Sequence, residues 1–207
     1  MNDDRGSLGP VHFERLYAAT EDPWRFRTSG YEQAKYRTAI EALADRSFRA
    51  ALEVGCSIGE MTRVLAPRCK AMLAVDIVEQ PLTVARAACA DQPWVRFVRM
   101  QVPQAWPDGM FDLIVLSEVL YFLSRKDIEA VAARAAGSLA ADGVVLLVNW
   151  SGRSADPCTG EEAAELFIER TRGWLKPRSH VDGVGYRLDL LGRHQMRLPT
   201  STSAQRF

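Results

Sequence analysis

The chain has 207 residues, of which 47% are hydrophobic and 25% are charged, and its 26 basic residues balance 26 acidic ones. This length and composition suit one globular domain whose core needs no disulfide or metal, and the neutral balance favours neither nucleic acid nor an anionic membrane as a partner. Residues 1–6 do not resemble a signal peptide and no apolar run is long enough to cross a bilayer, so we expect a cytoplasmic protein without membrane association.

The first part of the chain predicts a helical, aromatic segment ahead of the sheet. Over residues 31–43, apolar side chains recur at helical spacing after a Ser-Gly pair that can start a helix. We expect residues 1–45 to be an N-terminal segment of the same domain that covers the site, although plain core packing of its aromatic residues is equally open. Residues 12–36 contain six of them, namely Phe13, Tyr17, Trp24, Phe26, Tyr31 and Tyr36.

Strand and helix patterns then alternate through the middle of the chain. Helical patterns lie between short apolar runs, at residues 60–65, 81–90 and 126–139. The apolar runs predict five strands, at residues 50–54, 71–75, 95–100, 111–116 and 144–148, the last after an Asp-Gly turn signal. Such alternation implies right-handed crossovers and a parallel sheet, so we expect an α/β, doubly wound fold with helices on both faces.

The pattern is looser after the fifth strand. Residues 160–173 predict an amphipathic helix and residues 186–191 alternate as a strand, whereas residues 176–185 are too rich in glycine and charge to predict one firmly. We expect an antiparallel edge hairpin that completes a mostly parallel, seven-stranded sheet. The core then covers residues 46–198, and residues 199–207, rich in Ser, Thr and Gln, are expected to form a disordered tail.

A glycine loop at the end of the first predicted strand suits a ligand. Residues 52–59 read Leu-Glu-Val-Gly-Cys-Ser-Ile-Gly. Glycine allows the backbone to turn sharply and to approach a ligand that a Cβ would exclude, and the helix start that follows offers free N–H groups. Ligands of open parallel sheets bind beyond the carboxyl ends of the strands. Gly55 and Gly59 could also be plain turn residues, so the loop alone is a weak indication.

Asp76 ends the second predicted strand, 21 positions after Gly55. A carboxylate there can accept two hydrogen bonds from a ribose diol, although a lone Asp in this position is often a helix cap. In this order and spacing, the loop and the acid together indicate an adenosine-containing ligand. A nicotinamide dinucleotide fits less well, because its loop carries three glycines as G-x-G-x-x-G, whereas Gly55 and Gly59 enclose Cys-Ser-Ile.

The cysteines give no indication of a metal site or a redox site. Cys56, Cys69, Cys89 and Cys158 lie far apart and form no C-x-x-C pair. We expect free thiols and no bound metal. The chain has only three histidines, so a nucleophilic Cys–His pair is also disfavoured.

Several of these segments resemble known methyltransferases. Residues 52–59 resemble motif I of class I S-adenosylmethionine-dependent methyltransferases, and Ala-Val-Asp-Ile at residues 74–77 resembles motif II. More narrowly, Asp-Pro-Trp-Arg at residues 22–25 and FDLIVLSEVLYFL at residues 111–123 resemble the NodS family, nodulation N-methyltransferases that act on the amine of a deacetylated chitooligosaccharide. The resemblance covers most of the chain. It implies a Rossmann-like fold, S-adenosyl-L-methionine as cofactor, and an amine or amino-sugar acceptor bound by a monomer or homodimer.

The same resemblance implies the cofactor contacts. The loop glycines would flank the methionine part, Asp76 would hold the ribose hydroxyls, and Ile77 would pack on the adenine. The third strand departs from the family pattern, because Gln101 stands where an acid is common; its amide oxygen and the Val102 N–H can still serve the adenine. The implied cofactor-binding set is Trp24, Arg37, Glu53, Gly55, Cys56, Gly59, Asp76, Ile77, Gln101, Val102, Ser117 and Glu118.

The end of the fourth strand would lie under the reactive sulfonium. Methyl transfer is an in-line displacement, so the protein mainly aligns the acceptor and excludes water. A primary ammonium must first lose a proton, and Glu118 could accept it or hold the amine by a charge-assisted hydrogen bond. Glu118 could instead bind only the cofactor or cap the next helix. Tyr121 is either an acceptor-positioning hydroxyl or a core aromatic residue.

Other assignments stay open at this point. Arg25 or Arg37 could pair with the cofactor carboxylate, or both could be solvated. His180 could contact the acceptor or could simply be exposed. The acceptor could be a hydroxyl or carboxylate instead of an amine, and a cofactor-binding module without transferase activity is a further alternative.

Overall fold

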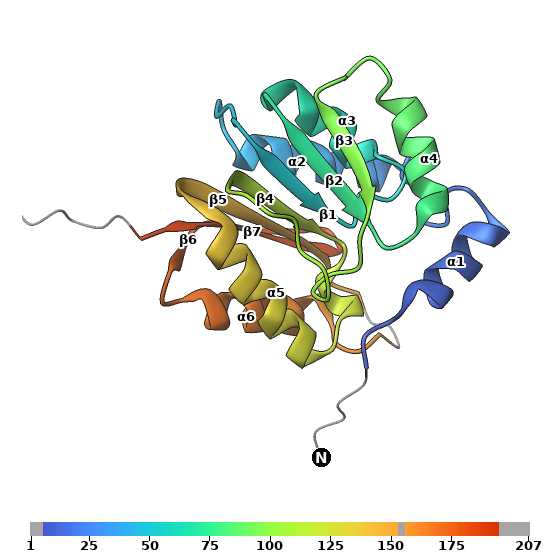
Figure 1. Cartoon of the computed structure of the whole chain (residues 1–207). Helices are drawn as coiled ribbons and strands as arrows, with labels where there is room; N and C mark the ends of the chain where they lie inside the picture. Colours follow the sequence, from blue (N-terminus) through green and yellow to red (C-terminus); the bar gives the residue numbers. More distant parts are fainter. Residues whose placement is uncertain (1–5, 153–155, 195–207) are drawn as a thin grey trace, which may run out of the picture.

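The computed structural model describes residues 6–152 and 156–194; the expected tail at residues 199–207 lies outside them. The described strands form one seven-stranded sheet in the order β3-β2-β1-β4-β5-β7-β6. β1 to β5 are parallel, whereas β7 runs antiparallel to β5 and to β6, which confirms the doubly wound α/β fold with an antiparallel edge hairpin (Figure 1). The strands are β1 (Ala51–Val54), β2 (Met72–Asp76), β3 (Val95–Arg99), β4 (Phe111–Ser117), β5 (Leu139–Trp150), β6 (Leu175–Gly183) and β7 (Tyr186–Arg193).

Two strands differ from the sequence prediction. β6 forms over a segment whose composition did not predict a strand firmly, because β7 pairs with it along its length in an antiparallel ladder, interrupted by one register shift between Pro177 and Ser179. β5 begins earlier than expected, at Leu139. Phe111 pairs with Leu139 but Leu113 pairs with Val144, so the Asp-Gly turn signal at residues 142–143 marks an irregularity inside β5.

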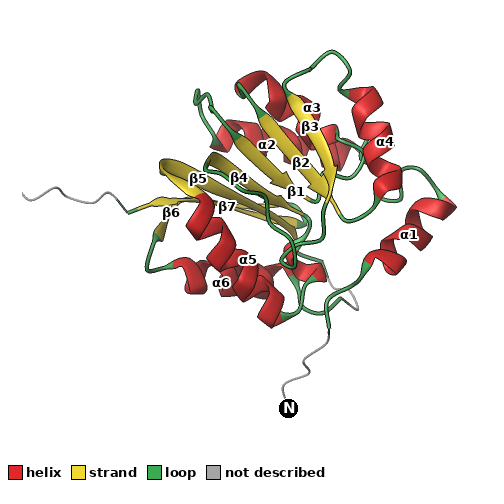
Figure 2. Cartoon of the chain, in the orientation of Figure 1, coloured by secondary structure: helices red, strands yellow, loops and turns green. Residues whose placement is uncertain are grey.

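Helices cover both faces of the sheet, as Figure 2 shows. α2 (Gly30–Ala42), α3 (Glu60–Leu65) and α4 (Glu79–Ala88) lie on one face, and α5 (Arg125–Ser138) and α6 (Gly160–Thr171) lie on the other. Ser and Thr side chains cap the N-termini of three of these helices, namely Ser29 in α2, Ser124 in α5 and Thr159 in α6. Short 3-10 helices, η1 (Ala66–Arg68) and η2 (Leu120–Phe122), follow α3 and β4.

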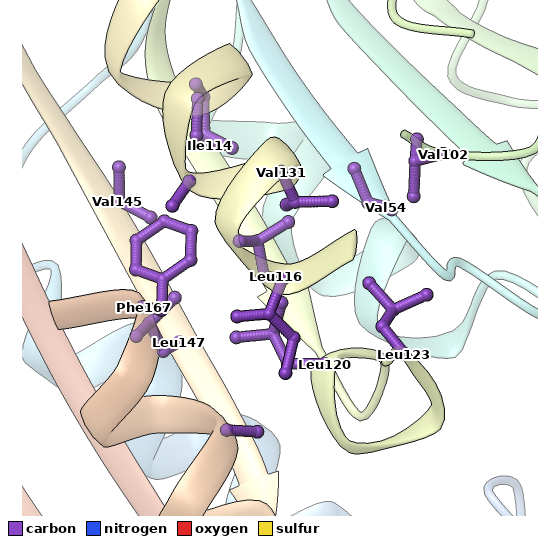
Figure 3. Packing of buried hydrophobic residues seen from close by; sticks show 14 of the residues in the cluster. Val54, Val102, Ile114, Leu116, Leu120, Leu123, Val131, Val145, Leu147 and Phe167 are labelled. Carbon is purple, nitrogen blue, oxygen red and sulfur yellow. The ribbon is translucent and has the colours of Figure 1, made fainter. Parts of the chain in front are cut away.

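The core under α5 and α6 fixes the strand ends that carry the site. Figure 3 shows Phe167 of α6 and Val131 of α5 against β4 and β5, and all of these side chains are buried. Leu120 and Leu123 belong to the same cluster, so the turn after β4 is anchored by its packing against this core. Each fully buried aliphatic or aromatic side chain contributes about 1.5–3 kcal/mol, which holds this turn firmly.

α1 (Pro10–Ala19) does not cover a face of the sheet but crosses the carboxyl ends of the strands. Before it, the Leu8 N–H donates to the Phe122 carbonyl oxygen at 2.9 Å. Near its end, the Gln80 amide donates to the Tyr17 carbonyl oxygen at 2.8 Å. The N-terminal segment is therefore fastened on both sides of the strand ends.

Candidate functional site

A cavity lies where the winding of the sheet reverses, at the carboxyl ends of β1 and β4. In doubly wound sheets this is the place where ligands bind. The cavity measures about 470 Å³, a size that suits a small organic ligand. Its walls come from the ends of β1, β2 and β4 and from α1 and α2.

The glycine loop lines the cavity at Gly55 but not at Gly59. Gly55 has φ +79°, and a Cβ there would meet the Val119 Cβ at 3.2 Å, so both the backbone and the space require glycine. At Gly59, a Cβ would meet the Ala85 Cβ at 2.9 Å. The structure therefore places Gly59 in the close contact between α3 and α4, outside the cavity.

Asp76 is fixed between the glycine loop and the start of α4. Its carboxylate accepts hydrogen bonds from the Ser57 N–H at 2.9 Å and the Val78 N–H at 3.0 Å, and the side chain still lines the cavity. Burial raises the pKa of Asp76 to about 6, although these N–H donors act in the opposite direction. The residue thus combines a capping role with an acceptor that faces the cavity.

Glu118 receives donors from three different elements. The Tyr121 hydroxyl donates to its Oε2 at 2.7 Å, the Trp150 N–H donates to the same oxygen at 2.9 Å, and the Lys35 ammonium donates to Oε1. Glu118 also has φ +57°, a left-handed conformation that is uncommon for a non-glycine residue. Such backbone strain is concentrated at functional sites, and Glu118 lines the cavity.

Lys35 was not predicted, and it is one of the most deeply buried side chains, with 1% of its surface exposed. Its Nζ lies 2.8 Å from Glu32 Oε2, contacts Glu118, and lies 5.0 Å from the centroid of the Tyr31 ring. The sequence signal was its helical spacing: Lys35 shares a buried face of α2 with Glu32. Arg37 lies two positions further on, on the exposed side of α2, and does not line the cavity.

The adenine-side residues of the prediction are brought together. Ile77, Gln101 and Val102 all line the cavity, next to Met100. Val102 is buried and Gln101 is exposed. The result is an apolar surface with amide groups beside it, which suits a planar base.

Three further predicted residues lie deeper in the wall. Glu53 is buried and accepts a hydrogen bond from the Thr62 hydroxyl at 2.6 Å, and burial raises its pKa to about 7. Burial also raises the pKa of the Cys56 thiol well above its usual value, which leaves it a poor nucleophile. Ser117 is buried and, like Glu53 and Cys56, lines the cavity.

Acidic side chains dominate the charge of the cavity. Within the described lining, Lys35 is the single lysine or arginine side chain. The carboxylates of the lining are Glu32, Glu53, Glu60, Asp76, Glu118, Asp127 and Asp156. This surplus suits a cationic ligand, and together with the glycine approach, the Asp76 acceptor and the apolar surface it fits the sulfonium, ribose and adenine of the expected cofactor.

Aromatic residues of the N-terminal segment close one side of the cavity. Trp24 lines it and stacks on Phe26, with ring centroids 5.6 Å apart. The Tyr17 hydroxyl and the Ser57 hydroxyl are hydrogen-bonded at 2.6 Å, which joins α1 to the glycine loop. Arg25, which lies between α1 and α2 in the sequence, is exposed and does not line the cavity.

His180 lies outside the cavity, on the edge strand β6. Its Nδ1 pairs with Asp189 at 2.8 Å and its Nε2 pairs with Asp182 at 2.9 Å, and 43% of the side chain is exposed. The Asp189 carboxylate raises the pKa of His180. The structure therefore places His180 in a surface ion-pair network.

The described residues contain neither a cluster of metal ligands nor a membrane-spanning helix. Across residues 6–152 and 156–194, no His, Cys, Asp or Glu side chains gather in threes or more as a metal site would require. Within the same ranges, no helix has the length and apolar character needed to cross a membrane. The four cysteines are free thiols.

Comparisons with known proteins point to one family. Residues 13–156 match the family model described as Nodulation protein S (NodS). Nodulation protein S of Sinorhizobium fredii is 34% identical over 121 residues, which cover 58% of this chain and 55% of that protein. Its counterpart in Bradyrhizobium diazoefficiens is 36% identical over 106 residues, 51% of each chain. This chain thus spans about half the length of the curated relatives that it matches.

Solved structures resemble most of the chain. A methyltransferase structure from Pseudomonas syringae has a TM-score of 0.70 at 31% identity, covering 80% of this chain and 100% of that one. The N-methyltransferase NodS from Bradyrhizobium japonicum, in complex with S-adenosyl-L-homocysteine, has a TM-score of 0.76 at 23% identity, covering 88% of this chain and 97% of that one. The second likeness shows the fold alone.

Proposed function

Since this chain belongs to the family of nodulation protein S (NodS), we propose that it is an S-adenosylmethionine-dependent methyltransferase that methylates the amine of a small molecule, such as an amino sugar or a deacetylated chitooligosaccharide. The observation that supports this most is the position of Glu118, fixed by three donors in an acid-rich cavity at the switch point of the sheet. An anionic wall attracts a protonated amine. A hydroxyl acceptor would gain nothing comparable from it.

The cofactor would occupy the part of the cavity between β1, β2 and the turn after β3. Asp76 would accept hydrogen bonds from the ribose hydroxyls, Ile77 and Val102 would contact the adenine, and Gln101 would offer its amide beside it. Gly55 would allow the methionine part to pass close to the backbone. When bound, this cofactor supplies an electrophilic methyl group on a sulfonium.

The chain's own residues would serve the acceptor on the other side of the cavity. Glu118 would hold the amine by a charge-assisted hydrogen bond or accept its proton, and Tyr121 would keep Glu118 oriented. Burial and the Glu118 charge raise the pKa of Tyr121, so its hydroxyl stays a donor. α1 and the aromatic residues of the N-terminal segment would exclude water from the reacting atoms.

Calorimetric titration with S-adenosylmethionine tests the shared premise. We expect binding in the micromolar range, and a chain that fails to bind would overturn the proposal. A labelled-methyl assay with deacetylated chitooligosaccharides and a panel of amines, alcohols and acids then identifies the acceptor class. We expect labelled product with amines; product from alcohols or acids alone would replace the N-methylation proposal.

A further inference from the structure

Glu118 is better placed to hold an amine than to take its proton. Its two carboxylate oxygens already accept from Lys35, Tyr121 and the Trp150 N–H. Three donors occupy most of the acceptor positions of a carboxylate. A second acid near the same point would be a better proton acceptor.

Glu32 is that second acid. It is buried, it lines the cavity, and it contacts the same Lys35 ammonium as Glu118. Within the part of the chain that the structure describes, Lys35 at 2.8 Å is the sole side chain that pairs with the Glu32 carboxylate. Glu32 therefore has more free acceptor positions than Glu118, whose Oε1 has room for one further donor such as the amine.

We propose that Glu32 is the general base of the reaction, taking the proton of the acceptor ammonium while Glu118 holds the amine. This inference rests on the proposed N-methyltransferase function and names the residue that performs its proton transfer. Lys35 is then a positioning residue, because its ammonium binds both carboxylates and holds them near each other.

The step balances in protons and charge. The N–H bond of the ammonium breaks, its electron pair stays on nitrogen, and the proton forms an O–H bond on Glu32. The free amine then attacks the methyl carbon, the carbon–sulfur bond breaks with its electrons on sulfur, and the methylated ammonium forms. Glu32, Lys35 and Glu118 together carry a charge of −1, so the cluster with its bound ammonium is neutral before and after the proton moves.

The surroundings of Glu32 support this role. Burial raises its pKa, Lys35 lowers it, and the charges of Glu118 and Asp22 raise it further, with an upward result. These groups come from α2, from the turn after β4 and from the loop before α2. A raised pKa brings the carboxyl group closer to the pKa of an ammonium, so the carboxylate accepts the proton of the ammonium more readily.

The test compares Glu32→Gln and Glu118→Gln in steady-state methyl transfer from pH 6 to pH 10, with the amine found in the acceptor assay. For Glu32→Gln we expect kcat to fall by about a hundredfold or more at pH 7, the range of general base catalysis. The rate should recover as the pH approaches the pKa of the acceptor ammonium, because the amine then loses its proton to solvent before it binds. For Glu118→Gln we expect mainly a higher KM for the acceptor.

Controls separate this inference from the proposed function and from misfolding. Glu41→Gln changes an exposed acid of α2 and should leave both constants unchanged. Calorimetry should show unchanged S-adenosylmethionine affinity in Glu32→Gln, and Glu32→Asp should retain part of the rate and a wild-type pH profile. An unaltered rate in Glu32→Gln, or a loss of cofactor affinity that accounts for the lost rate, would overturn the inference. A wild-type chain that transfers no methyl to amines would overturn the proposed function itself.

Discussion

At the scale of single residues, Asp76 links protonation to ligand binding. The ionised carboxylate is the form that accepts hydrogen bonds from a diol, and burial raises its pKa to about 6. Affinity for S-adenosylmethionine should therefore be constant well above pH 6. Well below pH 6 it should fall by about tenfold for each pH unit. Calorimetry between pH 5 and pH 8 measures this.

Asp76→Asn is the matched variant for that prediction. The amide cannot ionise but keeps one acceptor oxygen, so we expect about tenfold to a hundredfold weaker binding at pH 8, the loss typical of a hydrogen bond to a charged group. The pH dependence should flatten at the same time. Equal affinity and an unchanged pH profile in the variant would show that Asp76 does not contact the ligand.

The sequence predicted one half of the site better than the other. Gly55 and Asp76 follow strands whose apolar runs are plain, and their spacing alone brought them together at one edge of the sheet. Lys35 and Glu118 lie 83 positions apart, and no local pattern joins them. A lysine on a helix is normally solvated, so the helical spacing that groups Lys35 with Glu32 did not by itself indicate burial, which tertiary packing decides.

At the scale of elements, α1 shows what aromatic density can and cannot predict. The density indicated a covering segment, and Pro10 at the first helical position with Phe13 and Tyr17 four positions apart is a helix signal. The contacts that fasten this segment to η2 and α4 have no signal in the sequence. The same limit applies to β6, whose ladder with β7 outweighed its composition. Contacts between segments that are distant in the sequence therefore determined both the position of α1 and the formation of β6.

The Tyr17–Ser57 hydrogen bond allows the contribution of α1 to be measured. Tyr17→Phe keeps the ring and removes the bond to the glycine loop, which is worth about 0.5–1.5 kcal/mol. We expect S-adenosylmethionine to bind about threefold to tenfold more weakly and to dissociate faster in stopped-flow experiments. Tyr186→Phe, which loses a hydroxyl contact to Thr38 outside the cavity, is the control and should bind normally. Identical dissociation rates in both variants would mean that α1 does not retain the ligand.

At the scale of the whole molecule, Glu53 makes folding depend on pH. Burial raises its pKa from 4.5 to about 7, so between these values the folded chain holds a proton that the unfolded chain has lost. Stability should therefore be highest at the acidic end of this window and should fall as pH rises through it, by about 3 kcal/mol in total. The raised pKa of Asp76 acts in the same direction.

Glu53→Gln removes this dependence, because the amide cannot ionise and still accepts from the Thr62 hydroxyl. In urea unfolding we expect the variant to match the wild type near pH 5 and to exceed its free energy of unfolding by up to about 3 kcal/mol at pH 8. A variant less stable than the wild type at pH 8 would contradict the assignment.

The strand order also bears on how the chain is made. β7 is the last described strand in the sequence, yet it lies inside the sheet, hydrogen-bonded to β5 from Val144 to Trp150. During synthesis, β5 must therefore wait with an open edge of unpaired backbone groups and apolar side chains until β7 emerges from the ribosome. Premature termination between β5 and β7 would leave that edge permanently available to other chains, so ribosome stalling there would yield fragments prone to aggregate.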